Sequence, residues 1–241
     1  MSPLRTALTA FAAAMAAVIA LAQVARAVPW VAANLGALVA LVFLAIPFRV
    51  AAVRRVDMAD FGFTLDPIGR GIAFGAGFVA VVVPLFSLGF VAFYDAVCAP
   101  DAPGWLASLA MPGFCRSWHG WSGARIPSLG LGAVEAAFVQ VVVVAIPEEL
   151  FFRGFLHELC ERRWPPRRRV LGGGVGLALI VSSALFAVGH LAVAFDPRRL
   201  AVFFPGLAFG WLRSATGSIL AGVIAHTASN LLIDALTAVF F

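Results

Sequence analysis

Long apolar runs separated by short polar stretches dominate this chain. A membrane-spanning helix needs about 20 predominantly apolar residues, and six runs reach about that length. A further run, the sixth along the chain, is shorter, and we expect it to be tilted or partly re-entrant. The predicted spans cover residues 6–25, 29–48, 68–92, 130–152, 174–194, 200–212 and 217–239. The pattern therefore predicts an all-α protein, a polytopic membrane helical bundle of about seven transmembrane helices.

The composition favours a single membrane domain. Of the 241 residues, 62% are hydrophobic and 12% are charged, whereas a soluble domain averages about 25% charged residues. Little polar surface remains for a separate soluble domain, so residues 1–241 are interpreted as one integral membrane domain. Within it, residues 1–95 hold accessory amino-terminal helices, 96–128 form a long outer interfacial loop and 129–241 hold the last four helices.

The first run has two interpretations. It follows Arg5 and is rich in alanine, and Ala25, Arg26 and Ala27 resemble the small-residue site of a signal peptide. The run is nevertheless close to the roughly 20 residues needed to span a membrane. We interpret it as a retained first helix, with a cleaved signal peptide as the alternative.

The arginines predict how the bundle is oriented. The net charge is +5 and every basic residue is arginine, and these arginines fall at the ends of the apolar runs. Such a distribution is typical of a membrane protein and not of a nucleic-acid-binding one, because cytoplasmic loops carry an excess of Lys and Arg. The richer side holds Arg5, Arg49, Arg54, Arg55, Arg70, Arg162, Arg163, Arg167, Arg168, Arg169 and Arg213. We therefore expect the amino terminus in the cytoplasm.

The long loop after the third span is expected on the outer surface. Trp105, Trp118 and Trp121 agree with this position, because tryptophan prefers the membrane interface. The loop also holds Cys98 and Cys115. These form a disulfide if the loop meets an oxidising compartment, and two unpaired thiols are the alternative.

Glu148 and Glu149 stand side by side within one of the most apolar runs. Burying a charged side chain at the centre of a membrane costs roughly 2.5–3.5 kcal/mol, so such groups are paired or used. Glu149 and Arg153 are four residues apart and can pair on one helix face. Glu148 points about 100° away and is free to take a proton from water. Taken alone, this motif fits equally well a structural network of both glutamates and Arg153.

Two later apolar runs carry further polar residues. His190 can hold a water molecule as a neutral imidazole, although a lone membrane histidine is more often a hydrogen-bonding packing residue. His226 and Asn230 are four residues apart on one helix face. Two donors on one face can stabilise a developing oxyanion, and hydrogen bonding between helices is the alternative.

The depth of these residues favours one shared site. At a rise of about 1.5 Å per residue, Glu148, His190 and His226 lie about 20–24 Å from the cytoplasmic ends of their helices. This depth is somewhat past the midplane of a core about 30 Å thick, toward the outer face. His157, one turn beyond Arg153, is expected to be solvated near the cytoplasmic end.

Three motifs built on these residues resemble those of the CPBP family, the CAAX-protease and bacteriocin-processing intramembrane glutamic endopeptidases. The first is Glu-Glu-x-x-x-Arg at 148–153, the second Phe-x-x-x-His at 186–190 and the third His-x-x-x-Asn at 226–230. The resemblance covers about residues 130–232. Each motif is short, but three in order on membrane helices are specific.

The resemblance implies a role for each motif residue. Glu148 would activate the hydrolytic water and His190 would help to hold it, while His226 and Asn230 would form the oxyanion site. Glu149, Arg153 and Phe186 would be supporting residues, and the last four helices would form the catalytic core. The reaction would be peptide hydrolysis without a covalent intermediate or cofactor. Two histidines and a glutamate are also a reasonable zinc set, an alternative that stays open.

The resemblance also implies a membrane-associated protein or peptide as the substrate. The founding branch cleaves prenylated CAAX tails, whereas this chain resembles bacterial members, which places it in an inner membrane. Residues 151–158 are similar to the branch of myxosortase-type proteases, which process carboxyl-terminal sorting signals. The oligomeric state is left open. The alternatives are a non-catalytic binding or immunity protein of the same fold and a small transporter with Glu148 as its proton carrier. A single polar layer argues against the transporter.

Overall fold

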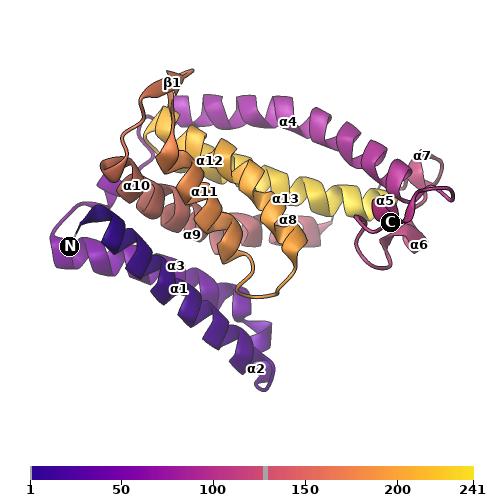
Figure 1. Ribbon diagram of the computed structural model, residues 1–241, viewed down its shortest axis with the longest axis horizontal. Helices are drawn as coiled ribbons and strands as arrows, with labels where there is room; N and C mark the ends of the chain where they lie inside the picture. Colours follow the sequence, from indigo (N-terminus) through magenta and orange to yellow (C-terminus); the bar gives the residue numbers. More distant parts are fainter. Residues whose placement is uncertain (1, 127–129) are drawn as a thin grey trace.

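The computed structural model of the protein describes residues 2–126 and 130–241, and most of them are helical. Within these described residues, five stretches are long and apolar enough to cross a membrane. They are α1 (Pro3–Ala25), α3 (Leu35–Arg54), α4 (Ile68–Val97), the stretch Leu131–Arg163 and α13 (Leu220–Phe240). Two shorter helices, α11 (Leu177–Gly189) and α12 (Phe203–Thr216), lie beside each other within the bundle (Figure 1). The prediction of a polytopic helical membrane bundle is confirmed.

Short elements connect the long helices. A β-hairpin, which the apolar pattern did not predict, precedes α11 with its two strands antiparallel. The connecting elements are α2 (Pro29–Ala33), the 3-10 turns η1 (Met58–Phe61) and η4 (Pro197–Val202), α5 (Gly104–Ala107), α6 (Phe114–Ser117), α7 (Gly120–Gly123), β1 (Arg168–Val170) and β2 (Gly173–Val175).

The fifth and sixth predicted spans are shorter in the structure than a full membrane crossing. At about 1.5 Å per residue, α11 and α12 are about 20 Å long, less than the core of about 30 Å. Both helices pack against the motif-bearing stretch in the middle of the bundle. Because protein rather than lipid surrounds much of their length, they do not need the full membrane thickness.

The stretch Leu131–Arg163 changes its helical geometry around Pro147. It consists of α8 (Leu131–Val139), the π-helical turn η2 (Gln140–Ala145), α9 (Ile146–Glu148), the π-helical segment η3 (Glu149–His157) and α10 (Glu158–Arg163). A proline removes one backbone donor from a helix, and π-turns are rare and occur often at functional sites. The wide turns therefore lie on both sides of α9, and the second of them begins at Glu149.

Segment η3 is the centre of the bundle. All nine of its residues are buried, and it packs against α1, α3, α11, α12 and α13. Its aromatic rings meet Phe43 of α3 and Phe186 of α11. On the α1 side the contact is made by small residues, among them Ala7 and Ala14. These contacts fix the helix that carries the first motif.

Helices α4 and α13 approach each other closely at two glycines. A Cβ atom at Gly75 would lie 2.9 Å from Ile224 Cβ, and one at Gly71 would lie 3.0 Å from Leu220 Cδ2. Small residues four apart allow such approach between membrane helices. The pair holds α13, which carries the third motif.

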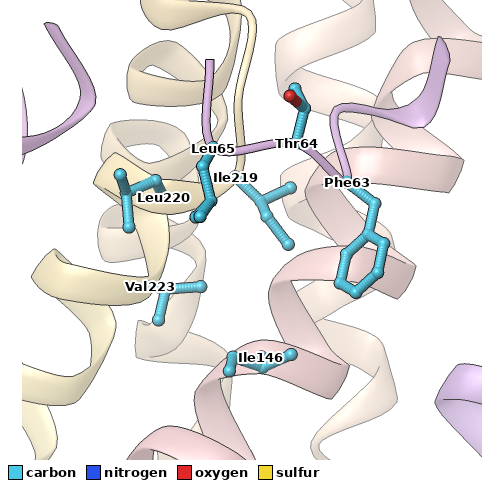
Figure 2. A pocket seen from close by; sticks show the side chains of 7 residues that line it. All are labelled: Phe63, Thr64, Leu65, Ile146, Ile219, Leu220 and Val223. Atoms are coloured by element: carbon cyan, nitrogen blue, oxygen red, sulfur yellow. The ribbon is translucent and has the colours of Figure 1, made fainter. Parts of the chain in front are cut away.

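The segment between α3 and α4 crosses the beginning of α13. Gly62 has φ 71° and its carbonyl accepts a hydrogen bond from the Ile219 amide at 3.0 Å. The Ser218 hydroxyl donates to the carbonyl of Thr64. Figure 2 shows Thr64 and Leu65 lying over the first turn of α13. Two backbone anchors thus fix this segment against the last helix.

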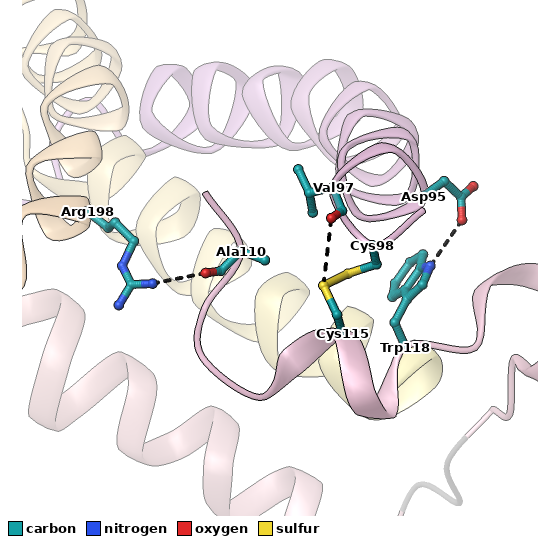
Figure 3. The surroundings of a disulfide bond; sticks show 7 residues. All are labelled: Asp95, Val97, Cys98, Ala110, Cys115, Trp118 and Arg198. Atoms are coloured by element: carbon teal, nitrogen blue, oxygen red, sulfur yellow. Dashed lines mark hydrogen bonds between the residues drawn. A yellow bond between two sulfur atoms is a disulfide. The ribbon is translucent and has the colours of Figure 1, made fainter. Parts of the chain in front are cut away.

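The loop after α4 contains a disulfide between Cys98 and Cys115 (Figure 3). Arg198, which lies just before α12, donates to the Ala110 carbonyl at 3.2 Å and so ties the loop to the α11–α12 connection. Arg198 also donates to Asp196, and these hydrogen bonds hold the pKa of that carboxyl below its usual range. Of the two alternatives for the cysteines, the structure has the disulfide.

Candidate active site

Glu149 and Arg153 form the ion pair expected from their spacing. Arg153 Nε lies 3.6 Å from Glu149 Oε2, and both side chains are almost completely buried. The guanidinium carbon of Arg153 stands 3.7 Å from the centre of the Phe186 ring, a cation–π contact that is favourable in a desolvated site. Phe186, the first residue of the second motif, is therefore a platform for the arginine of the first motif.

His226 lies between the two glutamates. Its Nδ1 is 3.0 Å from Glu149 Oε1 and its Nε2 is 3.9 Å from Glu148 Oε2. An ionised carboxylate only accepts, so the Nδ1 hydrogen of His226 points to Glu149. Phe209 of α12 stacks on the imidazole with ring centres 5.2 Å apart. The first and third motifs thus meet through one histidine.

Gly222 allows this meeting. A Cβ atom at this position would stand 2.6 Å from Glu149 Oε2 and 3.3 Å from its Cδ. Gly222 is one turn before His226 on α13, so the glutamate lies against bare backbone and still reaches the imidazole. The apolar pattern gave no signal for this glycine, because the need for it arises only from the packing.

Asn230 is hydrogen-bonded to a residue that the sequence analysis did not single out. Its Nδ2 donates to Gln140 Oε1 at 2.9 Å. A carboxamide nitrogen carries two hydrogens, so one remains for another acceptor. Gln140 is an isolated polar residue at the start of a valine run, and this was the signal that would have found it.

His190 lies at the end of α11 and not within a span. It is the residue that caps this helix, and its Nδ1 is 2.9 Å from the Phe186 carbonyl. Since a carbonyl only accepts, Nδ1 donates to the Phe186 carbonyl, which also accepts a hydrogen bond from the His190 backbone amide. The Nε2 atom of a neutral His190 is then an acceptor. The His190 ring also lies edge-on to the Phe186 ring, with ring centres 4.4 Å apart.

Glu148 faces an apolar groove. The groove has a volume of about 220 Å³, and its other lining residues come from α3, η2 and Val193, just after His190. The Glu148 side chain is 20% exposed, and its Oε2 atom has no hydrogen-bond partner among the residues that the structure describes. The described contacts join Glu148 to His226, and they place His190 beside Phe186 without a direct contact to Glu148.

The expectation that His157 is solvated is wrong. Its side chain is 1% exposed, its Nδ1 is 2.8 Å from Ser182 Oγ, and its Nε2 is 3.3 Å from Glu161 Oε1. Glu161 in turn accepts from Ser214 at 2.9 Å. The depth of His157 along the helix was read as exposure, whereas η3 is covered on all sides by other helices.

The part of the chain that the structure describes contains no group of three or more His, Cys, Asp or Glu side chains placed to hold a metal ion. The contacts of the motif residues are instead ion pairs, hydrogen bonds and aromatic stacking.

Comparison with known proteins identifies this region. Residues 130–232 match the family described as Type II CAAX prenyl endopeptidase Rce1-like. No curated protein and no solved structure matches the chain. The match spans all three motifs and the helices that bring them together. The protein is an integral membrane protein, and residues 130–232 in its carboxyl-terminal part are similar to the Rce1-like family of CAAX-type intramembrane proteases.

Proposed function

We propose that the protein is a glutamic endopeptidase that hydrolyses a peptide bond of a membrane-associated protein with water activated by Glu148. The observation that carries this proposal is the position of His226, which touches Glu149 through Nδ1 and faces Glu148 through Nε2. It places an unpartnered carboxylate oxygen and a potential hydrogen-bond donor within 3.9 Å of each other inside the bundle.

The buried charges balance if His226 is protonated. Two carboxylates beside one guanidinium leave one negative charge, and uncompensated buried charge is costly. An imidazolium at His226 removes this imbalance and supplies an Nε2 hydrogen. Asn230, one turn further along α13, has a second amide hydrogen available. These two donors suit an oxyanion that forms beside Glu148.

The proposed reaction needs only these groups. Glu148 takes a proton from water, and the water oxygen attacks the carbonyl carbon of the scissile bond. His226 and Asn230 donate hydrogen bonds to the resulting oxyanion. The carbon–nitrogen bond then breaks, and the proton on Glu148 passes to the leaving amine. The products are a new carboxyl terminus and a new amino terminus.

His190 is assigned to holding the water. Because its Nδ1 donates to the Phe186 carbonyl, its Nε2 lone pair can accept a hydrogen from water. Glu149 and Arg153 are positioning residues, since Glu149 orients His226 and Arg153 partners Glu149. Metal ions take no part in the proposed reaction.

Carboxyl-terminal sorting signals are the proposed substrates. The similarity of residues 151–158 to myxosortase-type proteases supports this choice, and so does the depth toward the outer face that the sequence predicts for the site. The Cys98–Cys115 disulfide supports an outer position of its loop, since disulfides persist in oxidising compartments. With the arginine distribution, this favours a bacterial inner membrane and a cytoplasmic amino terminus.

Mass spectrometry of protein carboxyl termini tests the proposal in cells. Cells that produce the protein should contain new carboxyl termini that are missing from cells producing Glu148→Gln at the same level. Glu135→Gln, on the exposed surface of α8, is a matched control that should retain cleavage. Identical termini in the Glu148→Gln and unmodified strains would refute the assignment of the base.

A further inference from the structure

An apolar pocket lies at the beginning of α13, the helix that carries His226. It has a volume of about 450 Å³, within the range of roughly 300–1,000 Å³ typical of ligand pockets. Thr64 is its one polar lining residue, and the pocket is formed by the segment before α4, by α9 and by the beginning of α13 (Figure 2). The lining residues are Phe63, Thr64, Leu65, Ile146, Ile219, Leu220 and Val223.

The pocket shares a helix face with His226. Ile219 and His226 are seven residues apart, so their side chains project within about 20° of each other on α13. Val223 lies between them, about 60° from His226. On the opposite wall, Ile146 precedes Glu148 by two residues. The two elements that carry the proposed base and the proposed oxyanion donor therefore also form the pocket.

The distance from the pocket to the site corresponds to a few residues of a peptide. Val223 and Ile219 lie about 4.5 and 10.5 Å before His226 along the helix axis. An extended peptide advances about 3.3 Å per residue. A side chain in the pocket would thus belong to a residue about one to three positions from the scissile bond.

The roof of the pocket is held in place. Thr64 accepts from the Ser218 hydroxyl, and the Ile219 amide donates to Gly62. Just before the roof segment along the chain, the Phe61 carbonyl packs directly against Gly154 of η3. A site fixed before binding loses less entropy when it is occupied. The roof is thereby connected to the same segment that carries Glu149 and Arg153.

We infer that this pocket binds a large apolar side chain of the substrate protein and selects the cleavage site. The inference rests on the proposed peptidase function and adds the residue preference to it. Phe63 and Leu65 at the rim are 43% and 63% exposed, so they set the width of the pocket without being part of the core. The occupant is a protein side chain because Val223 and Ile219, which line the pocket, lie about one and two turns before His226 on the same side of the last helix.

Two rim variants of the full-length protein test this inference in opposite directions. Leu65→Trp narrows the pocket, and Phe63→Ala widens it. Ile72→Trp, at a residue of α4 that is 49% exposed and does not line the pocket, is the control. The readout is the residue preference around cleavage sites, from mass spectrometry of carboxyl termini in cells that produce each variant.

We expect one position within three residues of the cut to favour large apolar side chains. Leu65→Trp should lower cleavage at sites with Phe or Trp there at least tenfold relative to sites with Ala or Val, since one methylene in an apolar pocket is worth about 10-fold or more. Phe63→Ala should shift the preference the other way, and Ile72→Trp should not change it. An unchanged preference in both rim variants overturns the inference.

Photocrosslinking gives a second result that does not depend on turnover. Benzoyl-phenylalanine at position 65 in the Glu148→Gln background should form adducts with a peptide from a cleaved protein. Adducts with lipid alone would overturn the inference, because the pocket would then be a lipid-filled groove. Normal cleavage by Glu148→Gln would instead refute the proposed function, so the two failures are distinguishable.

Discussion

The Gly222→Ala variant adds one methyl group against Glu149. The added Cβ would stand 2.6 Å from Glu149 Oε2, whereas ordinary contact begins at 3.4 Å, so the carboxylate has to retreat by about 0.8 Å. Glu149 holds His226 through a hydrogen bond of 3.0 Å. The displacement therefore passes to the imidazole that faces Glu148.

The cost of this displacement follows from two general magnitudes. Adding a methylene to a packed core costs about 1–3 kcal/mol of unfolding free energy. A shift of about 1 Å in catalytic groups costs on the order of 100-fold in rate. We therefore expect the turnover number to fall between 10- and 100-fold, with a small change in KM.

The assay is product formation in vesicles that hold a substrate identified by carboxyl-terminal mass spectrometry, together with thermal unfolding in detergent. Gly77→Ala on α4 is the control, because no atom of residues 2–126 or 130–241 would hinder its added Cβ within 4 Å. It should retain the rate, and its stability should be unchanged or higher by up to about 1 kcal/mol. Turnover by Gly222→Ala at the unmodified rate would refute the role of Glu149 in positioning His226.

Three further predictions separate the roles of the other residues. Glu148→Gln should abolish cleavage with little change in thermal unfolding. Glu149→Gln should abolish cleavage and also destabilise the fold by about 3–5 kcal/mol, because Arg153 and His226 lose their buried partner. Equal stability of the two variants would contradict the separate roles of the two glutamates. Asn230→Ala should lower the turnover number about 100- to 1,000-fold, because it removes a donor to the oxyanion. Gln140→Leu should lower the turnover number less, because it removes the partner of the Asn230 amide but leaves the amide in place. A larger loss in Gln140→Leu would contradict the assignment of Asn230 as the donor. Cys98→Ser should lower the unfolding free energy by about 3 kcal/mol, as expected for a disulfide that closes a loop of this length. Denaturation under non-reducing conditions measures this change in unfolding free energy.

The sequence predicted the membrane spans and the local pairs well, because both depend on residues close together in the chain. The apolar runs correspond to helices, and the spacing of Glu149 and Arg153 corresponds to a buried ion pair. It did not predict how short α11 and α12 are, since helix length within a bundle depends on neighbours and not on hydropathy.

Features that arise from packing were missed for the same reason. His157 was placed in solvent because its position along the helix was known but its neighbours were not. Gly222 and Gln140 matter through contacts with residues 73 and 90 positions away in the chain. The π-helical turns beside Pro147 alter the direction of the side chains around the glutamate pair, which an ideal α-helix does not describe.

The central claim, that Glu148 activates water for direct attack, is tested most directly with isotopically labelled water. Single turnover of the purified protein in water containing oxygen-18 should place one labelled oxygen in the new carboxyl group of the product and none in the peptide that contains Glu148. The Glu148→Gln variant should give no product. Oxygen-18 in the Glu148 carboxylate would indicate a covalent acyl intermediate, and product from Glu148→Gln would contradict the assigned base.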